Sequence, residues 1–285
     1  MNAVEIGDLA YEALLADVNA TPKPGLVDRA NAGAHTDMDH GTFLLSAEAL
    51  RPWFREFARL GEASAPKAPE AVLPSLRPAG IAAEEAMFAA TGGVNTHKGA
   101  IFSLGLLTTA AGRLTALNRP LTPEDTAATA GAFVSGICER ELGQTAATKG
   151  ERAYLADGST GVRGEAESGF QSVLTIALPA YRELLAKGAA DNDALCFALL
   201  RLIAKVPDTN IPTRLDMAAA DYARRAAGDC LKALDGLEPG GEAWLYHLIS
   251  LDRDFIERRI SPGGCADLLA CGWFLQCIVH NDRST

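Results

Sequence analysis

Apolar residues recur at helical spacing in one segment after another along this chain, and breaks rich in proline or glycine separate the segments. In residues 4–20, apolar side chains return every three or four positions with acidic residues between them, which is the pattern of a helix with one buried face. Alanine and leucine dominate, whereas the β-branched runs that favour strands are scarce. The sequence therefore predicts an all-α fold of about nine or ten helices in a single domain over residues 1–285.

The breaks place the predicted helices. We expect them at residues 4–20, 43–60, 81–90, 99–118, 123–140, 165–186, 191–204, 213–234, 242–260 and 265–279. The strongest start signal is Thr122, a good N-cap, followed by Pro123 at the first helical position. Residues 61–80 contain four prolines and are expected to form a connector with one short helical turn. Residues 25–39 are predicted to be an ordered polar loop, and residues 144–164 to be irregular.

Composition limits the classes of function. Hydrophobic residues make up 48% of the chain and the formal net charge is −10, so a large core is available and general nucleic-acid binding is disfavoured. The six cysteines form no Cys-x-x-Cys pair, which indicates buried free thiols in a reducing compartment. We find neither a signal-peptide pattern nor an apolar run long enough to span a bilayer. The expectation is a soluble cytoplasmic protein that binds neither nucleic acid nor membrane.

Residues 91–99 carry the densest group of polar side chains between two apolar segments. Gly92 and Gly93 allow a tight turn, His97 and Lys98 follow, and a helix then begins. Free N–H groups at a helix start favour an anion, so the stretch is typical of a phosphate-binding corner. It is not a Walker A loop, because no strand precedes it and the Gly-Lys-Ser/Thr order is missing. A helix cap followed by a solvated turn is an equally open interpretation.

Four breaks between helices hold most of the unusual polar residues, at residues 23–39, 92–98, 152–167 and 208–214. Their acidic residues are Asp28, Asp37, Asp39, Glu165, Glu167 and Asp208. Their basic residues are Lys23, Arg29, Lys98, Arg152, Arg163 and Arg214. If these loops converge at one end of a helix bundle, they could line one pocket. Such a mixture suits a polyphosphate held through Mg²⁺, because carboxylates bind the metal and cations bind the phosphates.

Each of these residues also has a purely structural explanation. Glu165 and Glu167 could complement a helix dipole, and Arg163 with Glu167 could form a surface ion pair. Residues 208–210 could cap the next helix, and His35 could be a hydrogen-bonded loop histidine. A classical zinc site is disfavoured because the histidines are scattered, and a Ser-His-Asp hydrolase because no Gly-x-Ser-x-Gly motif follows a strand.

Longer motifs run through nearly the whole chain in order. They are Thr-Pro-Lys-Pro-Gly-Leu-Val-Asp-Arg (residues 21–29), Gly-Ala-His-x-Asp-Met (33–38), Gly-Val-Asn-Thr-His-Lys-Gly (93–99), Ile-Phe-Ser-Leu-Gly-Leu-Leu (101–107), Arg-Gly-Glu-Ala-Glu (163–167), Asp-Thr-Asn (208–210) and Ser-Pro-Gly-Gly-x-Ala-Asp-Leu-Leu (261–269). On these motifs the chain resembles the triphosphoribosyl-dephospho-coenzyme A synthases, which serve citrate lyase, with a sister group for malonate decarboxylase. It departs from the pattern at Pro207 and Leu215-Asp216, where glycines are expected, and at Cys265, where serine is usual. The motif at residues 21–29 is closer to the citrate lyase branch.

The resemblance implies a specific reaction. ATP and 3′-dephospho-coenzyme A would give 2′-(5″-triphosphoribosyl)-3′-dephospho-coenzyme A and adenine, so the N-glycosidic bond breaks and the triphosphate survives. The ribose C1′ would pass through an oxocarbenium-like state, as in glycoside cleavage. The product would reach the lyase acyl-carrier protein through a downstream holo-acyl-carrier-protein synthase. Mg²⁺ is the expected cofactor, with ATP as a substrate.

The resemblance also implies roles for residues in the matching motifs. Candidate catalytic residues are Glu165, Glu167, Asp208 and His97. Candidate metal ligands are Asp37, Glu165, Glu167 and Asp208. Candidate substrate-binding residues are Lys23, Arg29, His35, Asn95, Thr96, Lys98, Arg163, Asn210 and Arg214. Among them Lys23, Arg29 and Lys98 are expected on phosphates, and Asn95 with His97 on ribose or adenine.

Other functions stay open at this point. The malonate decarboxylase counterpart would run the same chemistry for a different lyase. An Mg²⁺-dependent N-ribosyl hydrolase would use the same acids with water as acceptor, and would release adenine without dephospho-coenzyme A. A non-catalytic nucleotide-binding partner of the lyase would bind ATP and release no adenine.

Overall fold

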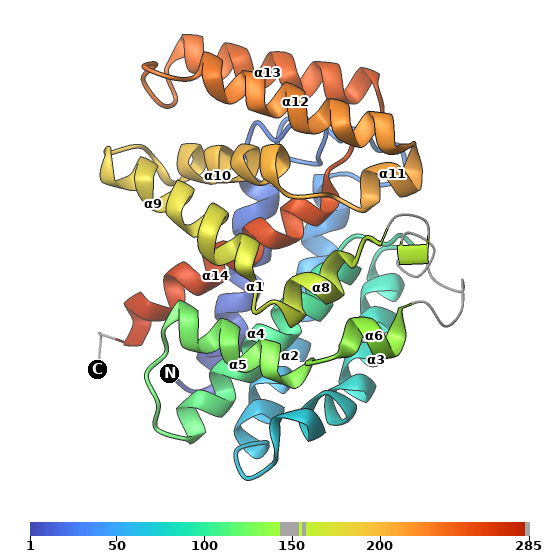
Figure 1. Ribbon diagram of the computed structural model, residues 1–285, viewed down its shortest axis with the longest axis vertical. Helices are drawn as coiled ribbons and strands as arrows, with labels where there is room; N and C mark the ends of the chain where they lie inside the picture. Colours follow the sequence, from blue (N-terminus) through green and yellow to red (C-terminus); the bar gives the residue numbers. More distant parts are fainter. Residues whose placement is uncertain (143–153, 156–157, 283–285) are drawn as a thin grey trace.

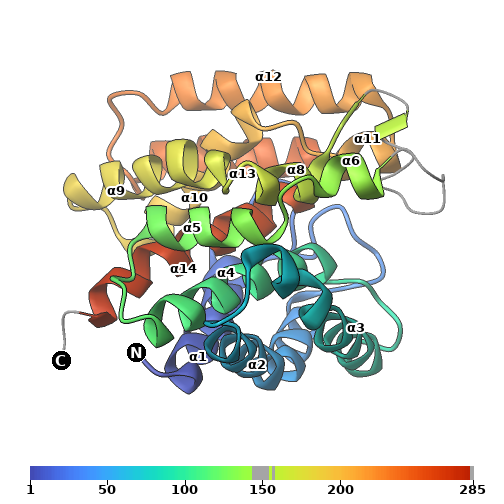
Figure 2. The same cartoon turned by 60° about the horizontal axis from the view of Figure 1, so that its bottom comes forward.

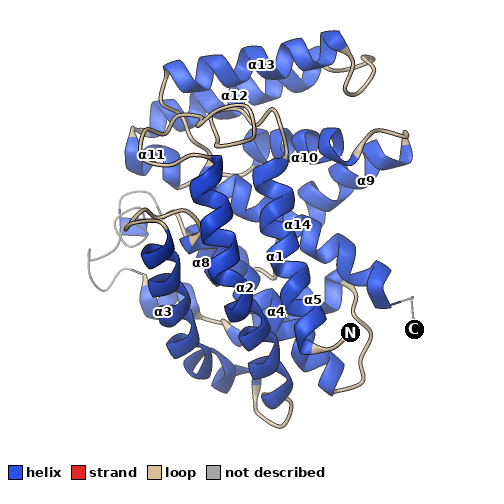
Figure 3. Ribbon diagram, turned by 180° about the vertical axis from the view of Figure 1, so that it is seen from behind, coloured by secondary structure: helices blue, strands red, loops and turns tan. Residues whose placement is uncertain are grey.

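The structure is a computed structural model that describes residues 1–142, 154–155 and 158–282, and none of these residues lies in a strand (Figure 3). The all-α prediction is confirmed. The α-helices are α1 (Ala3–Asn19), α2 (His40–Ala63), α3 (Val72–Ala90), α4 (Lys98–Ala116), α5 (Pro123–Phe133), α6 (Ile137–Glu141), α8 (Gly161–Glu167), α9 (Leu178–Ala186), α10 (Asp191–Lys205), α11 (Asn210–Arg214), α12 (Met217–Ala233), α13 (Glu242–Glu257) and α14 (Gly263–Asp282). A 3₁₀ turn, η1 (Pro69–Ala71), precedes α3, and a π-helical turn, η2 (Val173–Ala177), precedes α9.

The helices pack around one continuous hydrophobic core. Helix α2 lies against α1, α3 and α4, while α14 crosses α1, packs against α1 and α4 and also contacts α10 (Figure 1). Helices α12 and α13 pair on the side of the molecule opposite α2 and α3 (Figure 2). Glycine lets α2 and α4 approach closely, because a Cβ at Gly61 would overlap the carbonyl of Thr109 and one at Gly112 would overlap that of Ala58. No helix in the described part of the chain has the length and apolar character to cross a bilayer.

The predicted helix starts agree with the structure where the capping signal is strong. The Thr122 side chain accepts the Asp125 N–H, and Pro123 is the first residue of α5. At the start of α1, Asn2 and Glu5 form a capping box. These starts were predictable because a cap is made by residues three positions apart in the sequence.

The predicted connector at residues 61–80 is wrong over its second half. Helix α3 already begins at Val72, and Pro74 lies in its first turn, where no intrahelical N–H bond is needed. Pro78 lies inside the helix and removes one hydrogen bond, but Leu76 and Ala79 are buried beside it. Tertiary packing therefore holds the helix through a residue that usually ends one.

Three longer predicted helices are divided by turns. Residues 123–140 separate into α5 and α6 at Gly136, which has a φ of +72°. Residues 165–186 are interrupted after α8 by Gly169 and Phe170, both at positive φ, and the Phe170 side chain is fully buried. Residues 213–234 are divided because Asp216 caps α12. The described part of the chain therefore contains more helices than the nine or ten predicted. Residues 144–164, which were predicted to be irregular, lie mostly outside the described residues.

The loop at residues 20–39 is ordered, as predicted, and two carboxylates hold it. Asp28 accepts the N–H groups of Lys23 at 3.0 Å and of Ala30 at 2.7 Å. Asp252, on α13, accepts the N–H of Gly25 and the side-chain amide of Asn31, both at 2.9 Å. Backbone groups that would otherwise be unpaired are thus satisfied inside the fold, and the loop carries Lys23 into the interior.

Candidate functional site

A pocket of about 260 Å³ opens where the loop after α1, the turn before α4, helix α11 and the start of α14 meet. We name it the charged pocket. Nine of the predicted site residues line it, namely Lys23, His35, Asp37, Asn95, Thr96, His97, Lys98, Asn210 and Arg214. Three of the four polar breaks therefore converge, although Lys23 and Arg214 are 191 residues apart in the sequence.

A buried ion pair forms part of the charged pocket. Lys23 Nζ lies 3.0 Å from Asp17 Oδ1, and their side chains are only 2% and 6% exposed. Burial raises the pKa of Asp17, and the Lys23 ammonium opposes this rise. Two charges removed from water in this way are mutually dependent, because either one alone would be strongly unfavourable. The pair gives the pocket a fixed cation and a fixed carboxylate.

A second carboxylate, Asp267 on α14, faces the start of α4. It accepts the Ala100 N–H, and a Cβ at Gly99 would overlap its oxygen, so glycine is needed for this close approach. Burial raises the pKa of Asp267 well above its usual range, and the nearby carboxylates of Asp17 and Asp208 raise it further. A carboxyl group whose pKa is raised toward neutrality suits proton transfer.

His97 lies beside the Lys23–Asp17 ion pair and is 3% exposed. Its Nδ1 is 2.7 Å from Ser46 Oγ on α2, while its Nε2 has no hydrogen-bond partner among the described residues. Burial lowers the pKa of His97 to about 3, and the Lys23 ammonium contributes to this decrease. The imidazole is therefore neutral at physiological pH.

The outer part of the charged pocket carries more exposed groups. Lys98, with 55% of its side chain exposed, forms an ion pair with Glu84 at 2.7 Å. Arg214 lies 3.3 Å from both ring nitrogens of His35, whose Nε2 is 2.8 Å from Ser261 Oγ. Burial is the main cause that lowers the pKa of His35, followed by the Arg214 charge.

The predicted phosphate-binding corner is only partly open. At the start of α4, the Lys98 N–H is donated to Asn95 Oδ1 at 3.2 Å, and the Ala100 N–H is donated to Asp267. These two backbone groups are therefore not free for an anion. The Lys98 side chain at this corner is 55% exposed, so its ammonium is accessible from the pocket.

Several predicted residues lie outside the lining of the charged pocket. Arg29 is exposed and contacts Thr21 and Asn192. Arg163 pairs with Glu141 at 3.2 Å. Glu165 accepts the Ser172 N–H at 2.8 Å, and Glu167 accepts the N–H groups of Gly136 and Cys138. Arg152 lies outside the described residues.

Asp208 lies between the charged pocket and a second pocket. Its two oxygens accept the Asn210 N–H at 2.7 Å and the Cys265 N–H at 3.0 Å, which joins the starts of α11 and α14. Burial raises its pKa, and these backbone hydrogen bonds oppose the rise. Asp208 therefore connects two helix starts, but the helix that follows Pro212, α12, is capped by Asp216 and not by residues 208–210.

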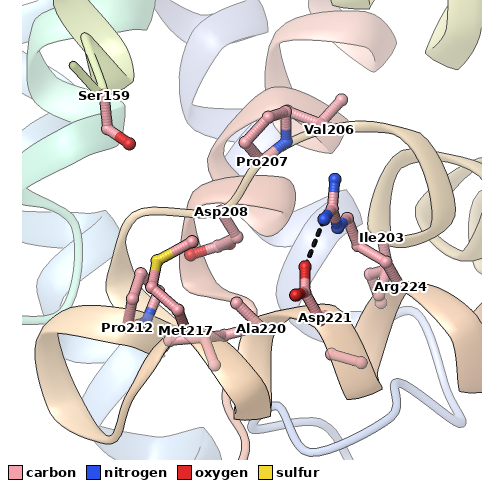
Figure 4. Close-up of a pocket in the computed structure, with 12 residues that line it drawn as sticks. Ser159, Ile203, Val206, Pro207, Asp208, Pro212, Met217, Ala220, Asp221 and Arg224 are labelled. Atoms are coloured by element: carbon pink, nitrogen blue, oxygen red, sulfur yellow. Dashed lines mark hydrogen bonds and ion pairs between the residues drawn. The ribbon is translucent and has the colours of Figure 1, made fainter. Parts of the chain in front are cut away.

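The second pocket, of about 220 Å³, is mainly apolar, and we name it the apolar pocket (Figure 4). Figure 4 shows Met217 and Pro212 on one side, Pro207 and Val206 on another, and the paired Asp221 and Arg224 at the edge. Asp208 lines it as well. The segment 208–214 forms a shared wall, since its other residues Asn210, Thr213 and Arg214 line the charged pocket.

The four predicted metal ligands do not come together. Asp37 lines the charged pocket, Asp208 lines the apolar pocket, and Glu165 and Glu167 bind backbone N–H groups. Within the described residues, no three His, Cys, Asp or Glu side chains are placed to hold one metal ion. The expectation that Mg²⁺ takes part is not tested by this geometry, because Mg²⁺ bound to a polyphosphate needs only one or two protein carboxylates.

Three further residues, Asp17, Asp267 and Ser46, lie at or beside the site although they were not predicted from the sequence. Asp17 was one acid among several in the first helix, Asp267 lies within the motif at residues 261–269, and Ser46 is an ordinary helical serine. Only the motif signal could have identified Asp267. Nothing local marks Asp17 or Ser46.

A known protein family matches almost the whole chain. The family model described as CitG, ATP:dephospho-CoA triphosphoribosyl transferase, matches residues 3–285. No solved structure matches the chain. Because the family match extends over almost the whole chain, including every segment of the charged pocket, the chain belongs to the CitG family of ATP:dephospho-CoA triphosphoribosyl transferases.

Proposed function

We propose that the charged pocket transfers the triphosphoribosyl group of ATP to the 2′-hydroxyl of 3′-dephospho-coenzyme A. The bond from ribose C1′ to adenine N9 breaks, and a bond from C1′ to the acceptor O2′ forms. The proton lost by the 2′-hydroxyl balances the one that adenine finally carries. The triphosphate stays attached throughout.

The observation that carries this proposal is the separation of charge within the charged pocket. The interior holds two acidic side chains, Asp17 and Asp267, with one cation, Lys23, whereas the cations Lys98 and Arg214 lie further out. An oxocarbenium-like C1′ needs nearby negative charge, whereas a triphosphate needs cations. A kinase-like site would instead place its cations at the phosphorus under attack.

Asp267 is the best placed group to accept the proton of the attacking hydroxyl. Its raised pKa means that it binds a proton more tightly than an ordinary aspartate. Its side chain also lines the pocket, where a substrate can contact it. Asp37 fits Mg²⁺ carried in by the triphosphate, since its side chain is 57% exposed at the same pocket. Bound there, the ion would neutralise phosphate charge.

The apolar pocket supports a transferase with two substrates. Dephospho-coenzyme A carries a long pantetheine arm, and the apolar pocket next to the charged pocket would accommodate its dimethyl portion against Met217 and Pro212. A hydrolase that uses water as the acceptor would not need the apolar pocket to bind an acceptor substrate. Substituting Ala220→Phe, which fills this pocket, should raise KM for dephospho-coenzyme A with little change in KM for ATP.

The test of the reaction is the product mixture. The purified protein with ATP, Mg²⁺ and dephospho-coenzyme A should release adenine in equal amount to a product that retains three phosphates. Excess chelator should stop turnover, and added Mg²⁺ should restore it. Adenine released at full rate without the acceptor would establish the hydrolase, and binding of ATP with no adenine released would establish a non-catalytic partner.

We propose that the product serves citrate lyase, because the motif at residues 21–29 is closer to the citrate lyase branch of the family. Incubating the product with a holo-acyl-carrier-protein synthase and each candidate carrier subunit would test this assignment. Transfer to the malonate decarboxylase carrier alone would reverse it.

A further inference from the structure

His97 is held rigidly beside the charged pocket. Its ring meets that of Phe43 edge to face, with centroids 4.9 Å apart. Its backbone N–H is donated to the sulfur of Met87 at 3.3 Å. Because the side chain is 3% exposed and confined on these sides, its ring nitrogens have fixed directions.

Two hydroxyl groups determine which ring nitrogen carries hydrogen. Thr96 Oγ1 donates to Ser46 Oγ at 2.7 Å, and Ser46 Oγ lies 2.7 Å from His97 Nδ1. In the arrangement that we infer, the Ser46 oxygen accepts the Thr96 hydrogen and donates its own hydrogen to Nδ1. Nδ1 is then an acceptor, and Nε2 carries the hydrogen of the neutral ring.

The Nε2–H group has no partner among the described residues, although the atom is buried. Leaving a buried donor unpaired is unfavourable, and native structures rarely do so without a functional reason. His97 lines the charged pocket, so a ligand bound there can supply the missing acceptor. The charged group that acts on the ring is the Lys23 ammonium, which favours the neutral form.

On the basis of the proposed function, we propose that His97 Nε2–H donates a hydrogen bond to a ring nitrogen of the departing adenine, and that Ser46 and Thr96 are positioning residues that fix its tautomer. As the bond from C1′ to N9 breaks, its electron pair passes to adenine, and the hydrogen bond stabilises the resulting negative charge. No proton leaves His97. A protonated imidazole would repel the positive charge that develops at C1′, so the neutral donor suits this reaction.

The first test pairs a substitution at His97 with altered leaving groups. His97→Ala should lower kcat with ATP roughly 10²–10³-fold, as removal of one preorganised donor does elsewhere. With 1-deaza-, 3-deaza- and 7-deaza-ATP, each lacking one acceptor nitrogen of the adenine ring, the ratio of wild-type to variant rates should shrink toward one for the analogue that lacks the nitrogen contacted by His97. Equal ratios for ATP and all three analogues would overturn the proposal.

The second test addresses the tautomer. Nitrogen-15 NMR of histidine-labelled protein, with the His97 signal assigned by its loss in His97→Gln, should show a neutral ring with Nε2–H from pH 5.5 to 8.5. Ser46→Ala and Thr96→Val should add the Nδ1–H form and lower kcat roughly five- to tenfold, the typical effect of one lost hydrogen bond. Ser103→Ala is the matched control, because Ser103 is a buried hydroxyl on α4 outside the pocket.

The two tests separate the inference from the proposed function. A His97 ring that titrates in this pH range, or that carries hydrogen on Nδ1 in the wild type, would overturn the inference even if adenine is released. A wild-type protein that releases no adenine would overturn the proposed function, and the NMR result would still decide the tautomer.

Discussion

The ion pair of Lys23 with Asp17 and the ion pair of Lys98 with Glu84 belong to the same pocket but are held very differently. The first pair is nearly removed from solvent, with side chains 2% and 6% exposed, whereas the second has side chains 55% and 32% exposed. A buried pair cannot exchange partners without leaving an unpaired charge in the interior. An exposed pair is screened and can open at little cost. The comparison indicates a preorganised interior and a rim that is free to adapt to substrate.

The largest expected effect comes from breaking the buried pair. Lys23→Met leaves Asp17 buried without its partner and should reduce the free energy of unfolding by about 3–5 kcal/mol. Urea denaturation at pH 7 measures this loss. Combining the substitution with Asp17→Asn removes both charges and should recover most of the stability. If Lys23→Met proved as stable as Lys98→Met, the two ion pairs would contribute equally to the free energy of unfolding.

Asp267→Asn should separate activity from stability within the interior. We expect kcat to fall roughly 10²–10⁴-fold, the usual contribution of general acid–base catalysis. Because the folded pKa of Asp267 is raised, the wild type loses stability as pH rises from about 4 through that folded value, when the carboxyl must ionise in place. The variant lacks this loss, so its stability relative to the wild type should increase from pH 4 to pH 8. An unchanged kcat would remove Asp267 from the mechanism.

A smaller effect is expected from Lys98→Met at the rim. If Lys98 exchanges Glu84 for a phosphate, KM for ATP should rise about fivefold, which corresponds to about 1 kcal/mol. The difference should diminish with added salt, since the contact is exposed. Initial rates at 50 and 500 mM salt measure both properties, and the melting temperature should not change. A large loss of stability would instead mean that Lys98 supports the fold, as Lys23 does in the buried ion pair.

The smallest effect is expected from Glu84→Gln. This substitution frees Lys98, so KM for ATP should decrease slightly, and the free energy of unfolding should change by less than about 0.5 kcal/mol. A titration of ATP binding measures the first effect and urea denaturation the second. Weaker ATP binding would mean that Glu84 orients Lys98 for substrate.

The helical fold and much of the charged pocket could be predicted from the sequence, but not the roles of individual acids. The polar breaks at residues 23–39, 92–98 and 208–214 all reach the pocket, as expected for loops at one end of a bundle. Glu165 and Glu167 had the same local appearance, yet their oxygens accept backbone N–H groups of neighbouring turns. A carboxylate that caps a helix and one that faces a ligand look alike until their neighbours in space are known.

Local chemistry by itself determined where the well-capped helices begin, because a cap such as Thr122 and a proline such as Pro123 act within one turn. Only the tertiary structure decided which charges are buried. Asp17 and Asp267 are 250 residues apart in the sequence, yet the Asp17 carboxylate raises the pKa of Asp267 by repulsion. The cause is desolvation, which depends on the packing of α1, α4 and α14 around a side chain and has no local signature along the chain.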